Sequence, residues 1–150
     1  MTGKAKILIV EDEAPVAVTM SFLLTRAGCE TEMANTRDDA IQMAQNCRFD
    51  LITLDVSMPN CNGFDLCIEI KQNPRLCHIP IVFVSGRSSL EDQQRGLDAG
   101  AVDYITKPFE TFEFVPRLMA HIKSSRALNV PDEIANTNAE DLCNSSQGNQ

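Results

Sequence analysis

Residues 51–63 read LITLDVSMPNCNG. The first four residues, Leu51 to Leu54, form a short apolar run that is typical of a strand buried on both faces of a sheet. Asp55 follows this run directly, and the proline, asparagines and glycine that come after it are typical of a loop. The stretch therefore predicts one carboxylate at the point where a buried strand opens into a loop, and Asp55 is the first candidate for a functional residue.

Strand-like and helix-like runs alternate along the rest of the chain, which favours βα units around a parallel sheet. The predicted strands are residues 6–10, 30–33, 50–54, 81–84 and 102–106. The predicted helices are residues 14–27, 36–46, 62–72, 88 or 89 to 99, and 111–126. We expect a doubly wound α/β domain with five parallel strands and five helices, in which residues 30–33, the most polar strand, lie at an edge.

The last predicted helix contains an irregularity at Pro116. A proline beyond the first turn removes a backbone hydrogen bond and clashes with the preceding turn. Either this helix begins late, with Pro116 near its start, or it is kinked. The neighbouring residues Phe109, Phe112 and Phe114 then either leave an aromatic ring exposed or all pack beneath the helix.

The overall charge of the chain excludes two classes of partner. The sequence has 13 basic and 21 acidic residues and a net charge of −8, which would repel nucleic-acid phosphates and anionic membrane surfaces. No apolar run approaches the roughly 20 residues needed to span a bilayer, and residues 1–4 lack the apolar region of a signal peptide. We expect a cytoplasmic protein with no direct nucleic-acid or membrane binding.

The six cysteines do not indicate a metal site. No two of them form a Cys-x-x-Cys pair, and only two histidines are available to complete a zinc site. We expect reduced cysteines that act as small apolar residues.

Five polar residues fall at the ends of predicted strands. In a doubly wound sheet the carboxyl ends of the strands share one edge, and ligands bind there; these residues are Glu11, Asp12, Asp55, Ser85 and Lys107. Three converging carboxylates repel one another unless a cation neutralises them, and Mg²⁺ prefers such oxygen ligands. A lysine beside them supplies a point charge for phosphate oxygens. The set therefore favours phosphoryl transfer to a carboxylate.

These residues, in their order and spacing, resemble the receiver domain of two-component response regulators, the CheY-like group. The motifs that carry the resemblance are Glu11-Asp12, Asp55 to Pro59 with Gly63, Ser85-Gly86, and Tyr104 to Phe109. It covers residues 5–125 and implies a flavodoxin-like sheet with strand order 2-1-3-4-5. Residues 126–150 are then a polar C-terminal tail with no output domain, in a receiver that acts alone or is part of a longer regulator.

The resemblance also implies a role for each matching residue. Asp55 is the expected phosphoacceptor for a sensor histidine kinase or a phosphotransfer protein. The implied Mg²⁺ ligands are Glu11, Asp12, Asp55 and the backbone carbonyl of Ser57. The implied switch residues are Ser85 and Tyr104, and those that contact the phosphoryl group are Lys107 and Ser85. Pro108 is expected to follow a cis peptide bond, and the residues expected to tune dephosphorylation are Ser57 and Arg87.

The implied function is a signalling switch and not an enzyme. A downstream protein would bind the face formed by residues 88–99, 102–106 and 111–126, and the sequence is also compatible with a homodimer. One alternative is a Mg²⁺-dependent aspartyl phosphatase-type hydrolase, but such enzymes usually carry a second acid where this chain has Ser57. The other alternative is a degenerate docking module that is not phosphorylated, and the presence of Asp12, Asp55 and Lys107 argues against it.

Overall fold

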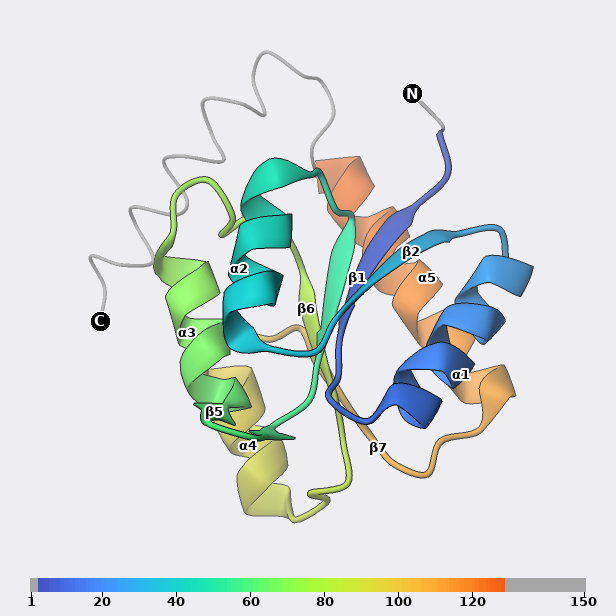
Figure 1. Ribbon diagram of the computed structural model, residues 1–150. Helices are drawn as coiled ribbons and strands as arrows, with labels where there is room; N and C mark the ends of the chain where they lie inside the picture. Colours follow the sequence, from blue (N-terminus) through green and yellow to red (C-terminus); the bar gives the residue numbers. More distant parts are fainter. Residues whose placement is uncertain (1–2, 129–150) are drawn as a thin grey trace.

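The computed structural model describes residues 3–128 (Figure 1). The main sheet contains β1 (Lys6–Val10), β2 (Glu30–Ala34), β3 (Leu51–Leu54), β6 (Ile81–Ser85) and β7 (Asp103–Thr106). The helices are α1 (Ala14–Arg26), α2 (Arg37–Asn46), α3 (Gly63–Gln72), α4 (Leu90–Asp98) and α5 (Thr111–Leu128). Two short strands, β4 (Ser57–Met58) and β5 (Cys61–Asn62), pair with each other outside the main sheet.

The main sheet is parallel throughout, with the order β2-β1-β3-β6-β7. In chain order these are the first to fifth strands of the sheet, so the predicted order 2-1-3-4-5 of a CheY-like fold is confirmed. The polar strand β2 lies at an edge, as its composition predicted. None of the described helices has the length and apolar composition that would let it cross a bilayer.

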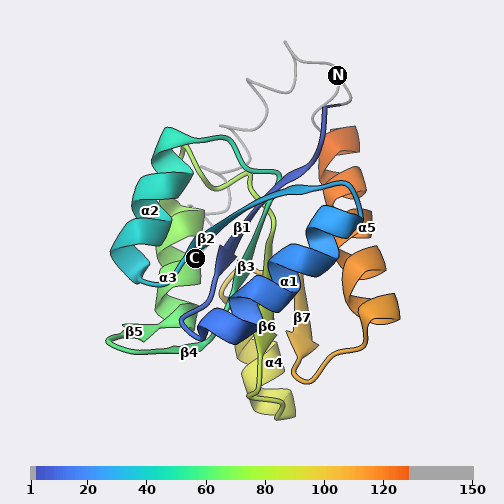
Figure 2. The same ribbon diagram turned by 45° about the vertical axis from the view of Figure 1, so that its right-hand side comes forward.

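Helices cover both faces of this sheet. In Figures 1 and 2, α1 and α5 lie on one face, and α2, α3 and α4 lie on the other. Alternate residues of β1 enter different cores: Ile7 and Ile9 pack with α1 and α5, whereas Leu8 and Val10 pack with α2 and α3. This arrangement explains why the central strands β1, β3 and β6 consist mostly of apolar residues, because both faces are buried.

The structure corrects the prediction for the start of the last helix. α5 begins at Thr111 and continues through Pro116, so the late start is wrong. Phe114 is fully buried beneath α5, and its ring stacks on Phe109 with 4.3 Å between centroids. Phe112 is 78% exposed, so one aromatic ring does remain on the surface.

The predicted loop after Asp55 contains a hairpin, formed by β4 and β5, that was not predicted. Its turn contains Asn60 at a φ of 58°, a left-handed conformation that asparagine tolerates well.

The expectation that all the cysteines are reduced is wrong. Cys29, Cys47, Cys61 and Cys67 are free thiols, but Cys77 is disulfide-bonded. Cys77 is half-buried in the loop after α3.

The last helix, α5, extends to Leu128. The predicted polar tail, residues 126–150, lies almost wholly outside the described residues and stays a prediction.

Candidate functional site

Three carboxylates meet at the carboxyl edge of the sheet. Glu11 and Asp12 follow β1, and Asp55 follows the adjacent strand β3. One carboxylate oxygen from each residue lies within 4.8 Å of the other two. The cluster is largely withdrawn from solvent, since Glu11 is 3% exposed and Asp55 is 5% exposed. The convergence predicted from the strand ends is therefore present.

Lys107 reaches this cluster from the end of β7. Its Nζ lies 2.7 Å from Glu11 Oε1 and 3.3 Å from Asp55 Oδ2. Burial opposes the charge on this lysine, but the hydrogen bond to Glu11 and the charges of Asp55 and Glu11 outweigh it and raise the pKa of Lys107. Burial raises the pKa of Glu11, and the charge of Asp55 adds to this effect. The lysine thus offsets part of the repulsion between two buried carboxylates.

The chemistry of the cluster fits a divalent cation with oxygen ligands. Asp12 Oδ1 is buried and has no hydrogen-bond partner among the described residues. An unpaired buried carboxylate oxygen is costly, and a cation is the partner that would relieve the cost. Carboxylates with no nitrogen or sulfur donor suit a hard ion such as Mg²⁺. Glu11, Asp12 and Asp55 are the side chains that the resemblance implied as Mg²⁺ ligands.

The residues after Asp55 hold its carboxylate and its backbone. The N–H of Ser57 donates to Asp55 Oδ1 at 3.3 Å, so Ser57 lies beside the candidate phosphoacceptor. A Cβ added to Gly63 would lie 2.2 Å from the backbone oxygen of Asp55, well inside any permitted contact. Gly63 therefore allows the start of α3 to pack directly on Asp55.

The predicted switch residues share one neighbour, Arg87. Ser85, which is buried at the end of β6, accepts a hydrogen bond from the N–H of Arg87 at 3.2 Å. The hydroxyl of Tyr104 donates to the carbonyl of Arg87 at 2.5 Å. The guanidinium of Arg87 pairs with Asp92 in the first turn of α4, with two N–O distances of 3.2 Å. Arg87 thus contacts Ser85, Tyr104 and α4.

Two features of the site were not assigned roles from the sequence. Gly63 was recognised only as part of a motif, and its position as the first residue of α3 is the one local sign of a special role, because glycine is a poor helix former. The N–H of Glu13 donates to Glu11 Oε2 at 3.2 Å and so fixes that carboxylate. Because the donor is a backbone N–H, the residue type at position 13 gives no signal that could have identified this contact. The peptide bond between Lys107 and Pro108 is cis, as the resemblance implied.

Comparison with known proteins gives a consistent result. Residues 7–119 match the family described as the response regulator receiver domain. The chain is 36% identical over 129 residues to the phosphate regulon transcriptional regulatory protein PhoB of Escherichia coli, covering 86% of this chain and 56% of that protein. It is 35% identical over 127 residues to the response regulator ArlR of Staphylococcus saprophyticus, covering 85% and 56%. The chain thus spans a little over half the length of these curated relatives.

The solved structures that are similar to this chain are covered over nearly their whole length, unlike the curated relatives. A putative response regulator from Chloroflexus aurantiacus superimposes with a TM-score of 0.77 at 31% identity, covering 80% of this chain and 98% of that one. The chemotaxis response regulator CheY4 of Vibrio cholerae gives a TM-score of 0.74 at 31% identity, covering 79% and 98%.

Proposed function

The chain belongs to the response regulator receiver domain family, and from this premise we propose that Asp55 accepts a phosphoryl group in a phosphorelay. The donor is a sensor histidine kinase or a phosphotransfer protein, and the exchange takes place in the cytoplasm. Receiver domains partner histidine kinases and are signalling modules rather than enzymes in the usual sense. The observation that carries the proposal is a buried Asp55 beside Glu11 and Asp12, with Lys107 Nζ at 3.3 Å.

The proposed reaction is a displacement at phosphorus. A carboxylate oxygen of Asp55 forms a P–O bond while the P–N bond to the donor histidine breaks, and the imidazole leaves with the electron pair of that bond. Mg²⁺, held by Glu11, Asp12, Asp55 and the carbonyl of Ser57, would supply positive charge to offset that of the phosphoryl oxygens. Lys107, which already bridges Glu11 and Asp55, is placed to contact one of those oxygens.

We further propose that the switch operates through Arg87. The Ser85 hydroxyl accepts a hydrogen bond from the Arg87 N–H and would donate its own proton to a phosphoryl oxygen. Turning Ser85 towards that oxygen would disturb the Arg87 backbone, and Tyr104 holds the carbonyl of the same residue. The change would then pass to α4 through the pair of Arg87 with Asp92. Ser57 and Arg87 are the residues proposed to tune the lifetime of the phosphorylated form.

The surface that would change on phosphorylation, and so alter partner binding, is formed by α4, β7 and α5. It presents apolar side chains that the fold does not bury, including Leu90, Leu97 and Phe112. We propose that a downstream protein, or a second copy of the chain, binds here. Residues 5–125 would then form the receiver domain.

The hydrolase and docking-module alternatives find less support. The residue two positions after Asp55 is Ser57, which has no carboxyl group for proton transfer to a phosphoester. The three acids lie within 4.8 Å of one another, and Lys107 contacts Glu11 and Asp55. A module that has lost phosphorylation would not need this arrangement.

The decisive experiment is to incubate the full chain with Mg²⁺ and acetyl phosphate and to record its intact mass. We expect a single phosphoryl adduct that requires Mg²⁺ and is absent in the Asp55→Asn variant. An adduct that persists in Asp55→Asn would refute the assignment of the acceptor. Steady hydrolysis of an added phosphoester without an adduct would support the hydrolase alternative.

A further inference from the structure

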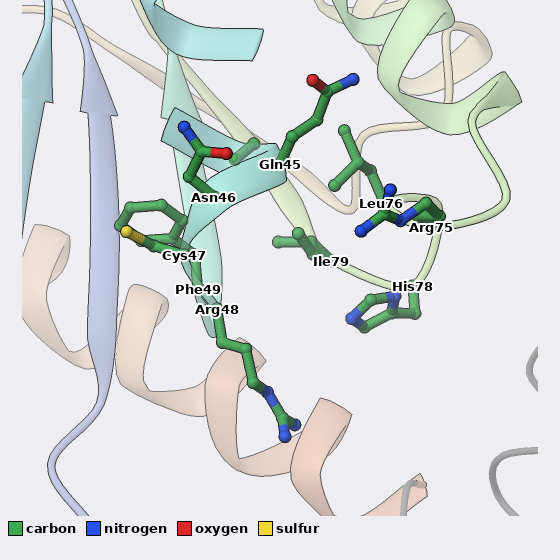
Figure 3. A pocket seen from close by; sticks show the side chains of 10 residues that line it. Gln45, Asn46, Cys47, Arg48, Phe49, Arg75, Leu76, His78 and Ile79 are labelled. Atoms are coloured by element: carbon green, nitrogen blue, oxygen red, sulfur yellow. The ribbon is translucent and has the colours of Figure 1, made fainter. Parts of the chain in front are cut away.

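A polar pocket lies at the amino edge of the sheet, away from the acidic cluster. It has a volume of about 390 Å³ and is formed by the end of α2, the loop before β3 and the loop between α3 and β6. Figure 3 shows Arg48 on one side of it and Arg75 and His78 on the other. We refer to this site, whose basic side chains are Arg48, Arg75 and His78, as the basic pocket. Its volume lies within the range of about 300–1,000 Å³ that is typical of small-molecule sites.

The two arginines of the basic pocket have no acidic partner within residues 3–128. The arginines that form ion pairs in this part of the chain are Arg37, Arg87, Arg117 and Arg126. A guanidinium group presents a planar fork of N–H donors, which matches the oxygens of a phosphate group. Arg48 and Arg75 are therefore available to hold a phosphate.

Neighbouring basic groups add to this positive charge. Burial lowers the pKa of His78, and the charges of Arg48 and Lys71 lower it further, as expected where cations gather without an acid. The whole chain has a net charge of −8, but charges further away than about 8 Å are largely screened at physiological salt. A small anion at the pocket therefore meets a positive field, although a long nucleic acid would be repelled by the rest of the surface.

Hydrogen bonds hold one wall of the pocket, the loop between α3 and β6, in place. Lys71 Nζ donates to the carbonyls of Cys77 at 3.0 Å and Ile79 at 2.8 Å. The carbonyl of Asn73 accepts from the N–H groups of Leu76 at 2.9 Å and Cys77 at 2.8 Å. A wall that is fixed in advance loses less conformational freedom when a ligand binds.

The remaining residues of the basic pocket suit a planar organic group. Its floor is apolar and is formed by the buried residues Phe49, Leu76 and Ile79. Gln45 and Asn46, in the last turn of α2, also line it. Each side-chain amide carries both donors and an acceptor, and such amides pair with the adjacent donor and acceptor on the edge of adenine.

We propose that the basic pocket binds an adenine nucleotide. The phosphate of the nucleotide contacts Arg48 and Arg75, and its base lies on the apolar floor with its polar edge towards Gln45 and Asn46. Binding is reversible and makes no covalent bond.

The first experiment compares a nucleotide with its two halves. Backbone amide spectra of the full chain are recorded during titration with adenosine monophosphate (AMP), adenosine or ribose 5-phosphate, with a chelator present to keep divalent cations from the acidic cluster. We expect AMP to shift the amides of residues 44–49 and 75–79. It should bind at least tenfold more tightly than either half, because each half lacks one set of contacts. Ribose 5-phosphate that binds as tightly as AMP would overturn the role of the base, and adenosine that does so would overturn the role of the arginines.

The histidines give a second readout. The sequence has two, and the other one, His121, pairs with Asp103 at 2.9 Å and serves as an internal control. A phosphate bound beside His78 should raise the pKa of its imidazole, whereas the titration curve of His121 should not change. AMP that shifts both curves, or neither, would overturn the assignment of the nucleotide to this pocket.

The last experiment tests the phosphate contacts. In the Arg48→Gln, Arg75→Gln double variant we expect the affinity for AMP to fall at least tenfold, since two charge-assisted contacts are lost. The matched control is Arg26→Gln, Arg95→Gln, which removes the same charge from α1 and α4 and should leave the affinity unchanged. All four substituted arginines are exposed, so the variants should fold normally, and a thermal melt checks this.

Equal losses of affinity in the two double variants, or no loss in either, would overturn the role of the basic pocket. Shift changes that concentrate at the acidic cluster, or no shift change at millimolar AMP, would overturn the proposal as a whole. None of these measurements depends on phosphorylation at Asp55.

Discussion

Replacing Gly63 by alanine separates two opposite expectations about one position. Alanine is the better helix former by up to about 1 kcal/mol, and Gly63 is the first residue of α3, so propensity alone predicts a gain in stability. The structure predicts a loss, because the new Cβ would lie 2.2 Å from the Asp55 carbonyl oxygen and 2.7 Å from Val56 Cα. Both of these atoms belong to the backbone, so no side-chain rotation can relieve the overlap.

The size of the effect follows from the displacement required. An ordinary contact begins near 3.4 Å, so α3 and the chain after β3 must separate by about 1 Å. Overpacking of this kind costs about 1–3 kcal/mol, and we expect a net loss of about 2 kcal/mol in the free energy of unfolding. Since the displaced residue is Asp55, the rate of its phosphorylation should also fall, on the order of 10²-fold for a misplacement of about 1 Å.

Urea unfolding measures the first quantity, and intact-mass kinetics with Mg²⁺ and acetyl phosphate measure the second. The matched control is Gly86→Ala, because a Cβ at Gly86 meets nothing within 4 Å and its backbone does not require glycine. The control should be neutral or slightly stabilising. If Gly63→Ala proves as stable and as reactive as the unsubstituted protein, the steric reasoning is wrong.

Three further predictions concern β7 and α5. Burial raises the pKa of Tyr104 above 10.0, so the fold should lose stability as the pH rises through that higher value. Because Tyr104 is the only tyrosine and the chain has no tryptophan, the absorbance of tyrosinate measures this pKa directly. A titration midpoint at or below that of the urea-unfolded chain would contradict the prediction. Burial opposes the charge on Asp103, but Arg117 and His121 hold its pKa below 3.8. Ionised Asp103 therefore stabilises the fold above about pH 4, and in that range Arg117→Gln should lower the free energy of unfolding by about 0.5–1 kcal/mol. Urea unfolding should show that this difference disappears below the pKa of Asp103 in the folded protein. A difference that is the same at all pH values would exclude the ion pair as its cause. Phe112→Ser should change stability by less than about 0.5 kcal/mol, whereas Phe114→Ala should cost about 3–5 kcal/mol, and comparable thermal melts for the two variants would contradict the observed burial.

The sequence predicted the acidic edge because its physical cause is local. Each functional side chain follows an apolar run, and parallel strands bring their carboxyl ends to one edge. The positions of Glu11, Asp55 and Lys107 could therefore be inferred before any distance was known. The pairing of Arg87 with Asp92 could not, because it depends on how the loop after β6 turns into α4.

Other features were missed because tertiary packing overrides local preference. Pro116 indicated a late or kinked helix, but burial of Phe114 and Leu118 stabilises a helix that begins at Thr111. The strands β4 and β5 contain two residues each, too few to show any periodicity. The contact of Gly63 with Asp55 depends on the angle at which α3 leaves that hairpin, which no local pattern encodes.

The length of the central strands has a thermodynamic consequence. β1 has five residues, and at roughly 3.3 Å per residue it separates the acidic edge from the amino edge by about 16 Å. Substitutions further apart than about 10 Å usually act additively, within roughly 0.5 kcal/mol. Arg75 is exposed in the loop between α3 and β6, at the amino edge. A double variant that combines Gly63→Ala with Arg75→Gln should therefore show the sum of the two single effects on stability. Any excess over that sum would be a direct measure of coupling along the strands between the two ends of the sheet.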